Sequence, residues 1–396
     1  MKPVPVSVFM YHTVGREHPD WLWRFLTIDY QKFDQQMATL RKMGCNSVTL
    51  GELYDYMENG TPLPKNPFVL TFDDGYLDNW VAVAPILKKY GFRGTVYMNP
   101  EFVDPTESCR PTLEDVWSKN ASLSDLSWDG FLSWAEMRQL EKEGVLDIQS
   151  HAMSHTWYFE SPELVDFQHP NDPYIWMYWN KYRDKKYSYL NDDAERYKEY
   201  GAPIYQHGKS LAVRRYFPDN NIHDELVEFV KDKGRETFFQ SDKWKPSLES
   251  LHADLLKKYG EGRYETDEEY HQRIDYELST SKEILETELN KKIDFFCWPG
   301  GGYNDYSLSK AHELYKSITL GSWDQQDKRN IPGDDPRQIK RTGLPYVEYG
   351  TSDFELDYLG GMYMYLQIKT FQKSKVHNFF RKVVKAGALL KAKATH

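Results

Sequence analysis

Short apolar runs alternate with amphipathic helical patterns along the first part of the chain, and this alternation constrains the fold most. The runs have the length and β-branching of buried strands, whereas the segments between them repeat apolar residues at helical spacing. They span residues 6–12, 46–50, 66–75, 93–100 and 145–151. Such alternation predicts a parallel sheet, in which functional residues gather at the carboxyl ends of the strands. The polar residues at these ends are His12, Asp73, Asp74 and His151.

The alternation is interrupted by an aromatic- and charge-rich segment that is far longer than an ordinary loop. We therefore expect an inserted lobe at 157–262, flanked by two parts of one regular α/β unit at 1–156 and 263–348. Residues 349–396 are expected to form a separate basic tail. Within the regular unit, Ser133 and Glu136 have the spacing of a capping box and predict the start of a helix.

Composition excludes several classes of protein for this chain of 396 residues. No run reaches the roughly 18 to 20 apolar residues of a membrane span, and the first residues lack the apolar core of a secretory signal. Three widely spaced cysteines indicate free thiols in a reducing compartment, so we expect a cytoplasmic protein. The net charge of −10 makes the body a poor general binder of nucleic acid.

Two adjacent aspartates follow the apolar run "FVLTF", and their charges repel each other unless something holds them apart. If Asp74 joins His151 and His155, the three can bind one metal ion, usually zinc, although such a set also suits ferrous iron. Asp73 is then left as the base for a metal-bound water, whose pKa the metal lowers to about 7. The alternatives are a turn with a helix cap for "DDG" and two surface histidines.

These motifs resemble those of the polysaccharide deacetylases, the chitooligosaccharide deacetylase-like carbohydrate esterases of family four. The resemblance rests chiefly on "TFDDG", "HAMSH" and "WPGGGYN", and it omits residues 157–262 and the tail. It implies a distorted (β/α) barrel with about seven parallel strands. It also implies that Asp73 is the catalytic base and that a divalent ion, in the first place Zn²⁺, is held by Asp74, His151 and His155.

The third motif implies that Pro299, Gly301 and Tyr303 line the substrate site, where a backbone amide beside a glycine can stabilise an oxyanion. A plain glycine-rich turn is the alternative. Many relatives carry a late Leu-x-His motif whose histidine protonates the leaving amine, and the sequence has no clear equivalent. By its position His12 is the candidate acid, although it can equally bind substrate or satisfy a backbone group. Arg341 resembles a late arginine that orients the base, and we also count it as a candidate substrate-binding residue.

We therefore predict a metal-dependent N-deacetylase that removes acetyl from an N-acetylated sugar, in the cytoplasmic synthesis of a surface glycan. Three alternatives stay open. The same fold and metal can hydrolyse another C–N bond, such as that of a cyclic amide. A ferrous oxygenase can use the same three ligands, but the βα alternation argues against its usual fold. A non-catalytic glycan-binding module is the third, and the intact pair of aspartates argues against it.

Aromatic side chains crowd the start of the predicted lobe, directly after His155. Aromatic faces stack on sugar rings, so we expect the lobe, and Trp157 among its residues, to form part of the substrate cleft. The alternative is that these side chains form the lobe's own core. They are Trp157, Tyr174, Trp176, Tyr178, Trp179 and Tyr182.

The tail contains eight lysine and arginine residues after Tyr365 and no acidic residue after Asp357. Apolar residues recur in it at helical spacing and predict one apolar face. They are Val376, Phe379, Phe380, Val383 and Val384. A basic amphipathic helix of this kind suits the surface of an anionic membrane, whereas the alternative is a helix that packs its apolar face on the barrel.

Overall fold

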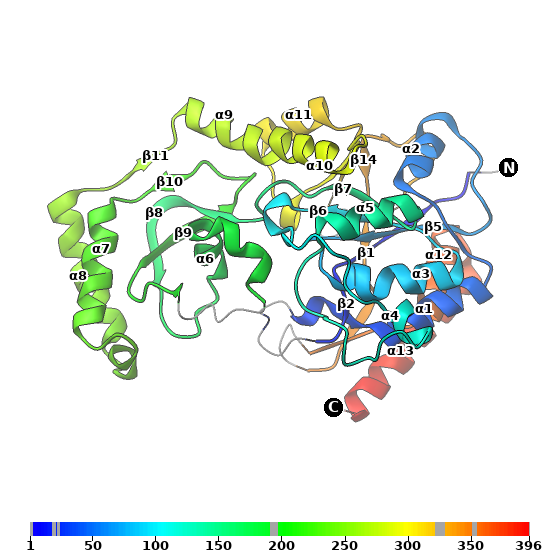
Figure 1. The fold of residues 1–396 in the computed structure, drawn as a ribbon, viewed down its shortest axis with the longest axis horizontal. Coiled ribbons are helices and arrows are strands. Elements are labelled where there is room, and N and C mark those ends of the chain that lie inside the picture. The colour runs from blue at the N-terminus through cyan, green and yellow to red at the C-terminus, as the bar shows by residue number, and fades with distance from the viewer. Residues whose placement is uncertain are drawn as a thin grey trace.

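A computed structural model describes residues 3–17, 21, 24–190, 197–320, 329–350 and 355–395. Parts of the predicted lobe (191–196) and of the predicted tail (351–354 and 396) lie outside the described residues. The chain forms a parallel sheet surrounded by helices, with a lobe that extends to one side and ends in two long helices (Figure 1). None of the described helices is long and apolar enough to span a membrane.

The central sheet has the strand order β14-β13-β12-β7-β6-β5-β1-β15, and β4 pairs with β5 beside this path. Every pairing in it is parallel, as the sequence predicts. The strands are β1 (Ser7–Tyr11), β4 (Asn46–Ser47), β5 (Pro67–Phe72), β6 (Gly94–Met98), β7 (Leu146–Ser150), β12 (Phe295–Cys297), β13 (Ser317–Thr319), β14 (Gln338–Ile339) and β15 (Thr342–Gly343).

The two ends of this strand order belong to one short segment of the chain. Ile339 of β14 pairs with Thr319, and Thr342 of β15 pairs with Phe9 of β1. Only Lys340 and Arg341 separate β14 from β15, so this segment connects the last strand of the sheet to the first. The predicted distorted barrel of parallel strands is thereby confirmed, and Arg341 lies where the ring closes.

Helices connect the strands where the sequence predicts them. They are α1 (Tyr30–Lys42), α2 (Leu50–Asn59), α3 (Ala84–Tyr90), α5 (Trp134–Glu143), α10 (Ser281–Leu289) and α11 (Asp305–Leu314). The predicted capping box of α5 is present, because Ser133 and Glu136 each accept a hydrogen bond from the other's backbone amide. Glycines in the left-handed conformation end α2, α3 and α5, where a side chain would strain the backbone.

The inserted lobe begins with a long antiparallel pair, β8 (Trp157–Phe167) and β9 (Pro203–Lys209). The helices α7 (Asn220–Asp232) and α8 (Trp244–Tyr259) pack on each other at its far end and have their own apolar core (Figure 1). Between the two strands lie α6 (Ile175–Lys181) and the 3-10 segment η4 (Arg183–Ser188). The chain returns to the barrel through β10 (Tyr216–Phe217), β11 (Arg263–Tyr264), α9 (Asp267–Asp275) and the π-helical segment η7 (Tyr276–Thr280).

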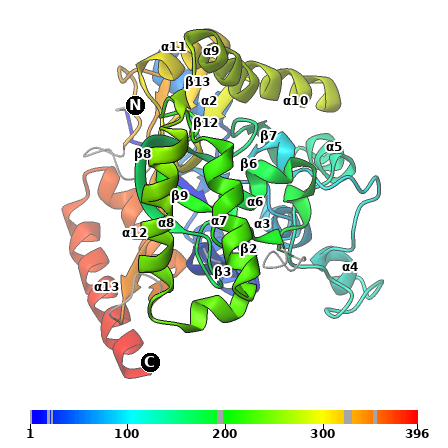
Figure 2. The ribbon, with the colours of Figure 1, turned by 90° about the vertical axis from the view of Figure 1, so that its left-hand side faces the viewer.

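Smaller elements complete the barrel and the lobe. They are β2 (Thr13–Gly15), η1 (Arg24–Leu26), β3 (Thr27–Asp29), η2 (Asn79–Val83), η3 (Pro100–Phe102), α4 (Leu113–Trp117), η6 (Arg235–Gln240) in the lobe, and η8 (Pro299–Gly301). Seen from the side of the lobe, α7 and α8 stand in front of the barrel (Figure 2). After residue 263 the chain returns to the barrel, where β12 pairs with β7 in the same sheet as the strands of the first part.

The C-terminal region contains the pair β16 (Tyr346–Glu348) and β17 (Leu356–Tyr358), followed by α12 (Gly361–Phe371) and α13 (Lys375–Thr395). The predicted helix of the tail is present, but its predicted apolar face divides. Val384 packs inward on a small cluster with Val347 and Tyr363, whereas Phe379 and Phe380 point to solvent. The alternating exposure arises because α12 and β16 cover only one side of α13.

Candidate functional site

The site begins at the end of β5, whose six residues are all buried. Asp74 and Gly75 both have positive φ, 73° and 72°, so the chain turns sharply directly after Asp73. A Cβ on Gly75 would lie 1.9 Å from the sulfur of Met98, which leaves room only for glycine. This turn points the two neighbouring carboxylates to different partners.

Asp73 is buried and paired with a cation. Nη1 of Arg341 donates to Oδ1 of Asp73 at 2.5 Å, and Nε2 of His12 lies 4.0 Å from Oδ2. Burial alone would raise the pKa of Asp73, but the charge of Arg341 outweighs it and the pKa is lowered. Asp73 is therefore an ionised carboxylate with one oxygen fixed by Arg341.

Asp74 faces two histidines instead. Its Oδ1 lies 3.2 Å from Nε2 of His151 and 3.3 Å from Nε2 of His155. Burial raises the pKa of Asp74, but these imidazoles outweigh it, His155 most, and the pKa ends well below its usual value. Burial lowers the pKa of His155 to about 4, which keeps this ring neutral as metal binding requires.

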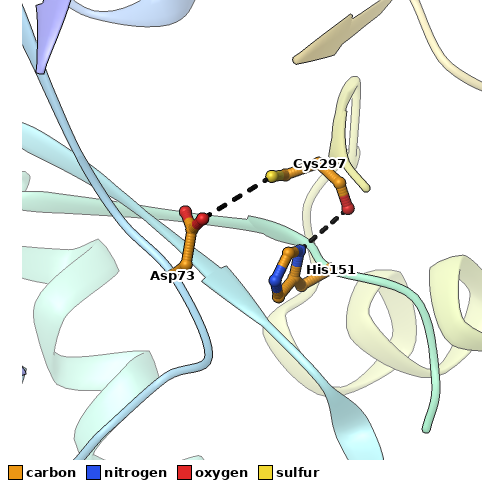
Figure 3. A group of neighbouring side chains, drawn as sticks. All are labelled: Asp73, His151 and Cys297. Atoms are coloured by element: carbon orange, nitrogen blue, oxygen red, sulfur yellow. Dashed lines mark hydrogen bonds between the residues drawn. The ribbon is translucent and has the colours of Figure 1, made fainter. Parts of the chain in front are cut away.

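His151 is oriented by its other ring nitrogen. Nδ1 lies 2.8 Å from the backbone oxygen of Cys297, to which it donates (Figure 3). Nε2 is thereby left on the side of Asp74. Burial lowers the pKa of His151, but the neighbouring Cys297 and the carboxylate of Asp74 raise it, and the net direction is above its usual value. A carbonyl that fixes the tautomer in this way is typical of metal-binding histidines.

These residues fit a divalent metal ion. One ligand atom each from Asp74, His151 and His155 lies within 4.8 Å of the others, and the buried Oδ1 of Asp74 has no hydrogen-bond partner in the described part of the chain. A buried carboxylate oxygen without a donor is costly unless a cation binds it. Two imidazoles and one carboxylate are a ligand set that zinc accepts, with positions left for water or substrate.

A second group of potential ligands, Asp73, His151 and Cys297, lies directly beside the first (Figure 3). Two of its three residues already accept hydrogen bonds from Arg341. Nη2 of Arg341 donates to the Cys297 sulfur at 3.0 Å and Nη1 donates to Asp73, while the Cys297 sulfur lies 3.8 Å from Asp73. A guanidinium at this position repels a metal ion, so the geometry favours the set that contains Asp74.

The loop that carries both histidines is held by a buried carboxylate. Glu277 of η7 accepts hydrogen bonds from the backbone amides of Met153, at 3.2 Å, and Ser154, at 3.0 Å, and also from the Ser154 hydroxyl. Asn99 donates to the backbone oxygens of His151 and Ala152. The positions of the histidines thus depend on the second half of the barrel as well as on β7.

The lobe also holds this loop, through Lys186. Its fully buried ammonium donates to the backbone oxygen of Ser154 at 2.8 Å and to Glu101 at 2.5 Å. Arg183 pairs with the same glutamate. The lobe is therefore attached to the candidate metal site by buried charges and not only by chain connectivity.

We expect the replacement of Lys186 by methionine to lower the free energy of unfolding by about 3 kcal/mol, because Glu101 is left buried without its main cation. The matched control is Lys181→Met in the same lobe. Lys181 pairs with Glu199 at 2.6 Å but is 45% exposed, so its loss should cost less than about 1 kcal/mol. Urea denaturation of both variants measures the difference, and equal losses would contradict the proposed attachment.

A cavity of about 300 Å³ opens over these residues and is walled by aromatic rings from the barrel and the lobe. The lining residues are Met10, His12, Phe25, Leu26, Asp73, Asp74, Tyr76, Asn99, Phe102, Phe131, His151, His155, Trp157, Trp179, Tyr189, Lys209, Trp298, Gly300, Gly301 and Arg341. Its volume lies at the small end of the range for ligand pockets.

Most of the residues singled out in the sequence meet in this cavity. His12, Asp73, Asp74, His151, His155, Trp157, Gly301 and Arg341 line it. Pro299 and Tyr303 do not line it. Pro299 is buried, and Tyr303 is 37% exposed and packs its ring on Trp298. Arg341 reaches the cavity with its guanidinium taken by Asp73 and Cys297, an arrangement that suits orientation of the base better than substrate binding.

The glycine-rich loop differs from the predicted oxyanion site in one respect. The amide of Gly301 donates to the backbone oxygen of Trp298 at 3.0 Å, so it is engaged within the turn. By contrast, Nε1 of Trp298 is buried without a hydrogen-bond partner among the described residues. The Gly301 amide is therefore not the free donor that the sequence predicts.

Sequence reasoning missed several cavity residues that come from separate elements. Lys209, at the end of β9, donates to the backbone oxygen of Gly300, and a Cβ on Gly300 would lie 2.7 Å from its ammonium. Tyr189 enters from the lobe. No motif marks Lys209. Trp179 belongs to the aromatic cluster expected in the cleft and does line the cavity, whereas other members of that cluster, such as Trp176 and Tyr178, line a second pocket.

Comparison with known proteins agrees with the sequence motifs. Residues 60–200 match the model of the polysaccharide deacetylase family. The poly-beta-1,6-N-acetyl-D-glucosamine N-deacetylase of Escherichia coli (strain K12) is 25% identical over 249 residues, which cover 60% of this chain and 34% of that protein. The same enzyme of Escherichia coli O157:H7 is 24% identical over 249 residues. The chain thus spans about a third of the length of these curated relatives.

Two solved structures share the fold at 18% identity and a TM-score of 0.51. A de-N-acetylase from Aggregatibacter actinomycetemcomitans covers 85% of this chain and 94% of its own. The BpsB deacetylase domain from Bordetella bronchiseptica covers 86% of this chain and 96% of its own. The family match over residues 60–200 confirms the resemblance drawn from the motifs: this part of the chain matches the polysaccharide deacetylase family.

Proposed function

We propose that this protein is a metal-dependent N-deacetylase that hydrolyses the acetamide of an N-acetylated sugar. The observation that supports it most is that two adjacent carboxylates contact different partners. Asp74 faces two imidazoles within 3.3 Å, whereas Asp73 contacts Arg341 at 2.5 Å. Amide hydrolysis by a metal-dependent enzyme needs one carboxylate as ligand and another that accepts a proton.

In this proposal Asp74, His151 and His155 hold the cation, in the first place zinc. Bound there, a divalent ion supplies a Lewis acid that polarises the acetamide carbonyl and lowers the pKa of water. Asp73 accepts the proton of the attacking water through Oδ2, since Arg341 fixes Oδ1. Arg341 acts as a positioning residue, because it keeps Asp73 ionised and directed into the cavity.

Two further side chains have candidate roles in the same reaction. His12 lies 4.0 Å from Asp73 and lines the cavity, so it is placed to return a proton to the leaving amine. The indole N–H of Trp298, which is buried without a hydrogen-bond partner among the described residues, is the candidate donor to an oxygen of the substrate as its charge develops. Both groups come from the barrel, whereas the aromatic rings of Trp157 and Trp179 come from the lobe.

The substrate class follows from the walls and from the relatives. Aromatic faces such as Trp157 suit the apolar face of a sugar ring. The matched relatives are named for poly-β-1,6-N-acetyl-D-glucosamine, and the same sugar unit is the substrate we propose here. Whether the unit is part of a polymer, a lipid-linked oligosaccharide or a nucleotide sugar changes only what lies outside the cavity.

The test is acetate release from N-acetylglucosamine oligomers with β-1,6 and β-1,4 linkages, from lipid-linked oligosaccharides and from nucleotide-linked N-acetylhexosamines. We expect release from at least one class, loss of more than 90% of it (about tenfold) after chelation, and recovery when zinc is returned. A cyclic amide serves as the control substrate for another C–N hydrolase. Reloaded protein that releases no acetate from any of the sugars would contradict the proposal.

A further inference from the structure

Helix α13 presents an apolar stripe to solvent. Of the large apolar side chains exposed among the described residues, five of twelve lie on this one helix. They are Val376, Phe379, Phe380, Val383 and Leu390. Phe379 is 63% and Leu390 72% exposed. Single exposed apolar residues are normal on a protein surface, but a continuous row on one helix marks an interaction site.

The stripe is not the face that holds α13 on the body. The opposite face packs Val384, Leu389 and Ala392 against Val347 and Tyr363. On the same inner side Nη1 of Arg381 donates to the Tyr363 hydroxyl at 2.9 Å. Because one face already attaches the helix to the barrel, the stripe remains available for a partner.

The edges of the stripe are basic. Exposed lysines follow the helix along its length, and no acidic residue occurs anywhere in it. They are Lys375, Lys382, Lys385, Lys391 and Lys393. The protein as a whole carries a net charge of −10, so this helix is opposite in sign to the rest of the molecule. A partner must therefore satisfy both an apolar stripe and cations beside it.

We propose that α13 docks the protein on an anionic lipid bilayer, with Phe379, Phe380 and Leu390 in the boundary between headgroups and acyl chains and the lysines at lipid phosphates. Such a bilayer supplies apolar depth and negative charge together. A second copy of the chain supplies the apolar surface only, because pairing two stripes would bring their lysines together. The charges of the helix thus favour lipid over self-association.

The position of α13 is compatible with docking. It lies at the outer edge of the molecule, on the side away from α7 and α8 (Figures 1 and 2). The site in the barrel takes no part in this contact, so the inference is independent of the proposed function. The cytoplasmic location stays a prediction. Docking through α13 would make the protein a peripheral protein at a membrane face.

Vesicle flotation of the full chain tests the docking. We expect the protein to float with phosphatidylglycerol vesicles at low salt, and to float at least about tenfold less with phosphatidylcholine vesicles, since each lysine near an anionic surface contributes about fivefold. Phe379→Ser/Leu390→Ser should reduce binding to phosphatidylglycerol about tenfold or more. The matched control, Trp117→Ser/Leu123→Ser, removes exposed apolar residues elsewhere and should float like the unchanged protein.

Three outcomes would overturn the docking. One is an unchanged protein that does not float with phosphatidylglycerol at low salt, and another is equal flotation of the stripe variant and the control. The third is a dimer in light scattering that the stripe variant dissociates while no vesicle binding is seen, which would assign the stripe to self-association. Far-UV circular dichroism confirms that each variant is folded, and acetate release from a soluble substrate should be unchanged in all of them.

Discussion

Asp74→Ala is expected to lose bound metal and acetate release together. Oδ1 of Asp74 is the one buried carboxylate oxygen directed at both His151 and His155 and without a hydrogen bond among the described residues. Replacing a residue that hydrogen-bonds a metal ligand already lowers metal affinity about 10- to 100-fold. Loss of the ligand itself should lower the affinity by at least about 100-fold. Metal content after dialysis and the rate of acetate release measure the two effects.

The matched control for this variant is Asp166→Ala. Asp166 is a partly buried aspartate of the lobe that pairs with Lys245 at 2.9 Å, outside the cavity. Its replacement should leave the metal content unchanged and alter activity less than about threefold, since it touches none of the proposed ligands. A fully active Asp74→Ala protein, or one that keeps its metal, would show that another set of ligands is used.

Asp73→Asn is the second substitution with a large expected effect, because it should remove the catalytic base. The amide keeps the shape of the side chain but cannot accept a proton from water, so acetate release should fall by at least about a hundredfold. The variant also leaves the guanidinium of Arg341 buried without its carboxylate. We therefore expect the free energy of unfolding to fall by about 3 kcal/mol, which urea denaturation measures.

The sequence was sufficient to predict the parts of the site that are local in the chain. The apolar run of β5 ends directly before Asp73, and the parallel arrangement brings that end to the same rim of the sheet as the end of β7, which precedes His151 and is separated from β5 by β6. Strand ends in a parallel barrel gather at one rim whatever the intervening residues are. This is why a run of apolar residues followed by carboxylates was informative without any knowledge of the tertiary contacts.

Contacts across long stretches of chain were not predictable in the same way. Only the family resemblance led us to expect Arg341 to orient the base. Arg341 reaches Asp73 from the short link between β14 and β15, the two ends of the strand order, and nothing near it in the sequence indicates that position. Lys186 and Glu277 hold the histidine loop from two other elements. Each is one charged residue among many, and only its burial in the folded chain distinguishes it.

The burial of the tail helix was also only partly predictable from the sequence. Helical periodicity correctly predicted α13 and placed Phe379 and Phe380 on one face. Periodicity could not predict which of these side chains would be covered. Val384 is covered because α12 and β16 pack on its side of the helix. Periodicity fixes which side chains share a face, whereas the neighbours decide which face is covered.

The most direct test of the division between the two aspartates is a side-by-side measurement of bound zinc and acetate release for Asp73→Asn and Asp74→Asn. Both substitutions remove one negative charge and keep nearly the same volume, so they differ only in which carboxylate is lost. The account predicts that Asp73→Asn binds zinc in the same amount as the unchanged protein and releases no acetate, while Asp74→Asn loses both. An Asp73→Asn protein that releases acetate at the normal rate, or an Asp74→Asn protein that keeps its zinc, would contradict it.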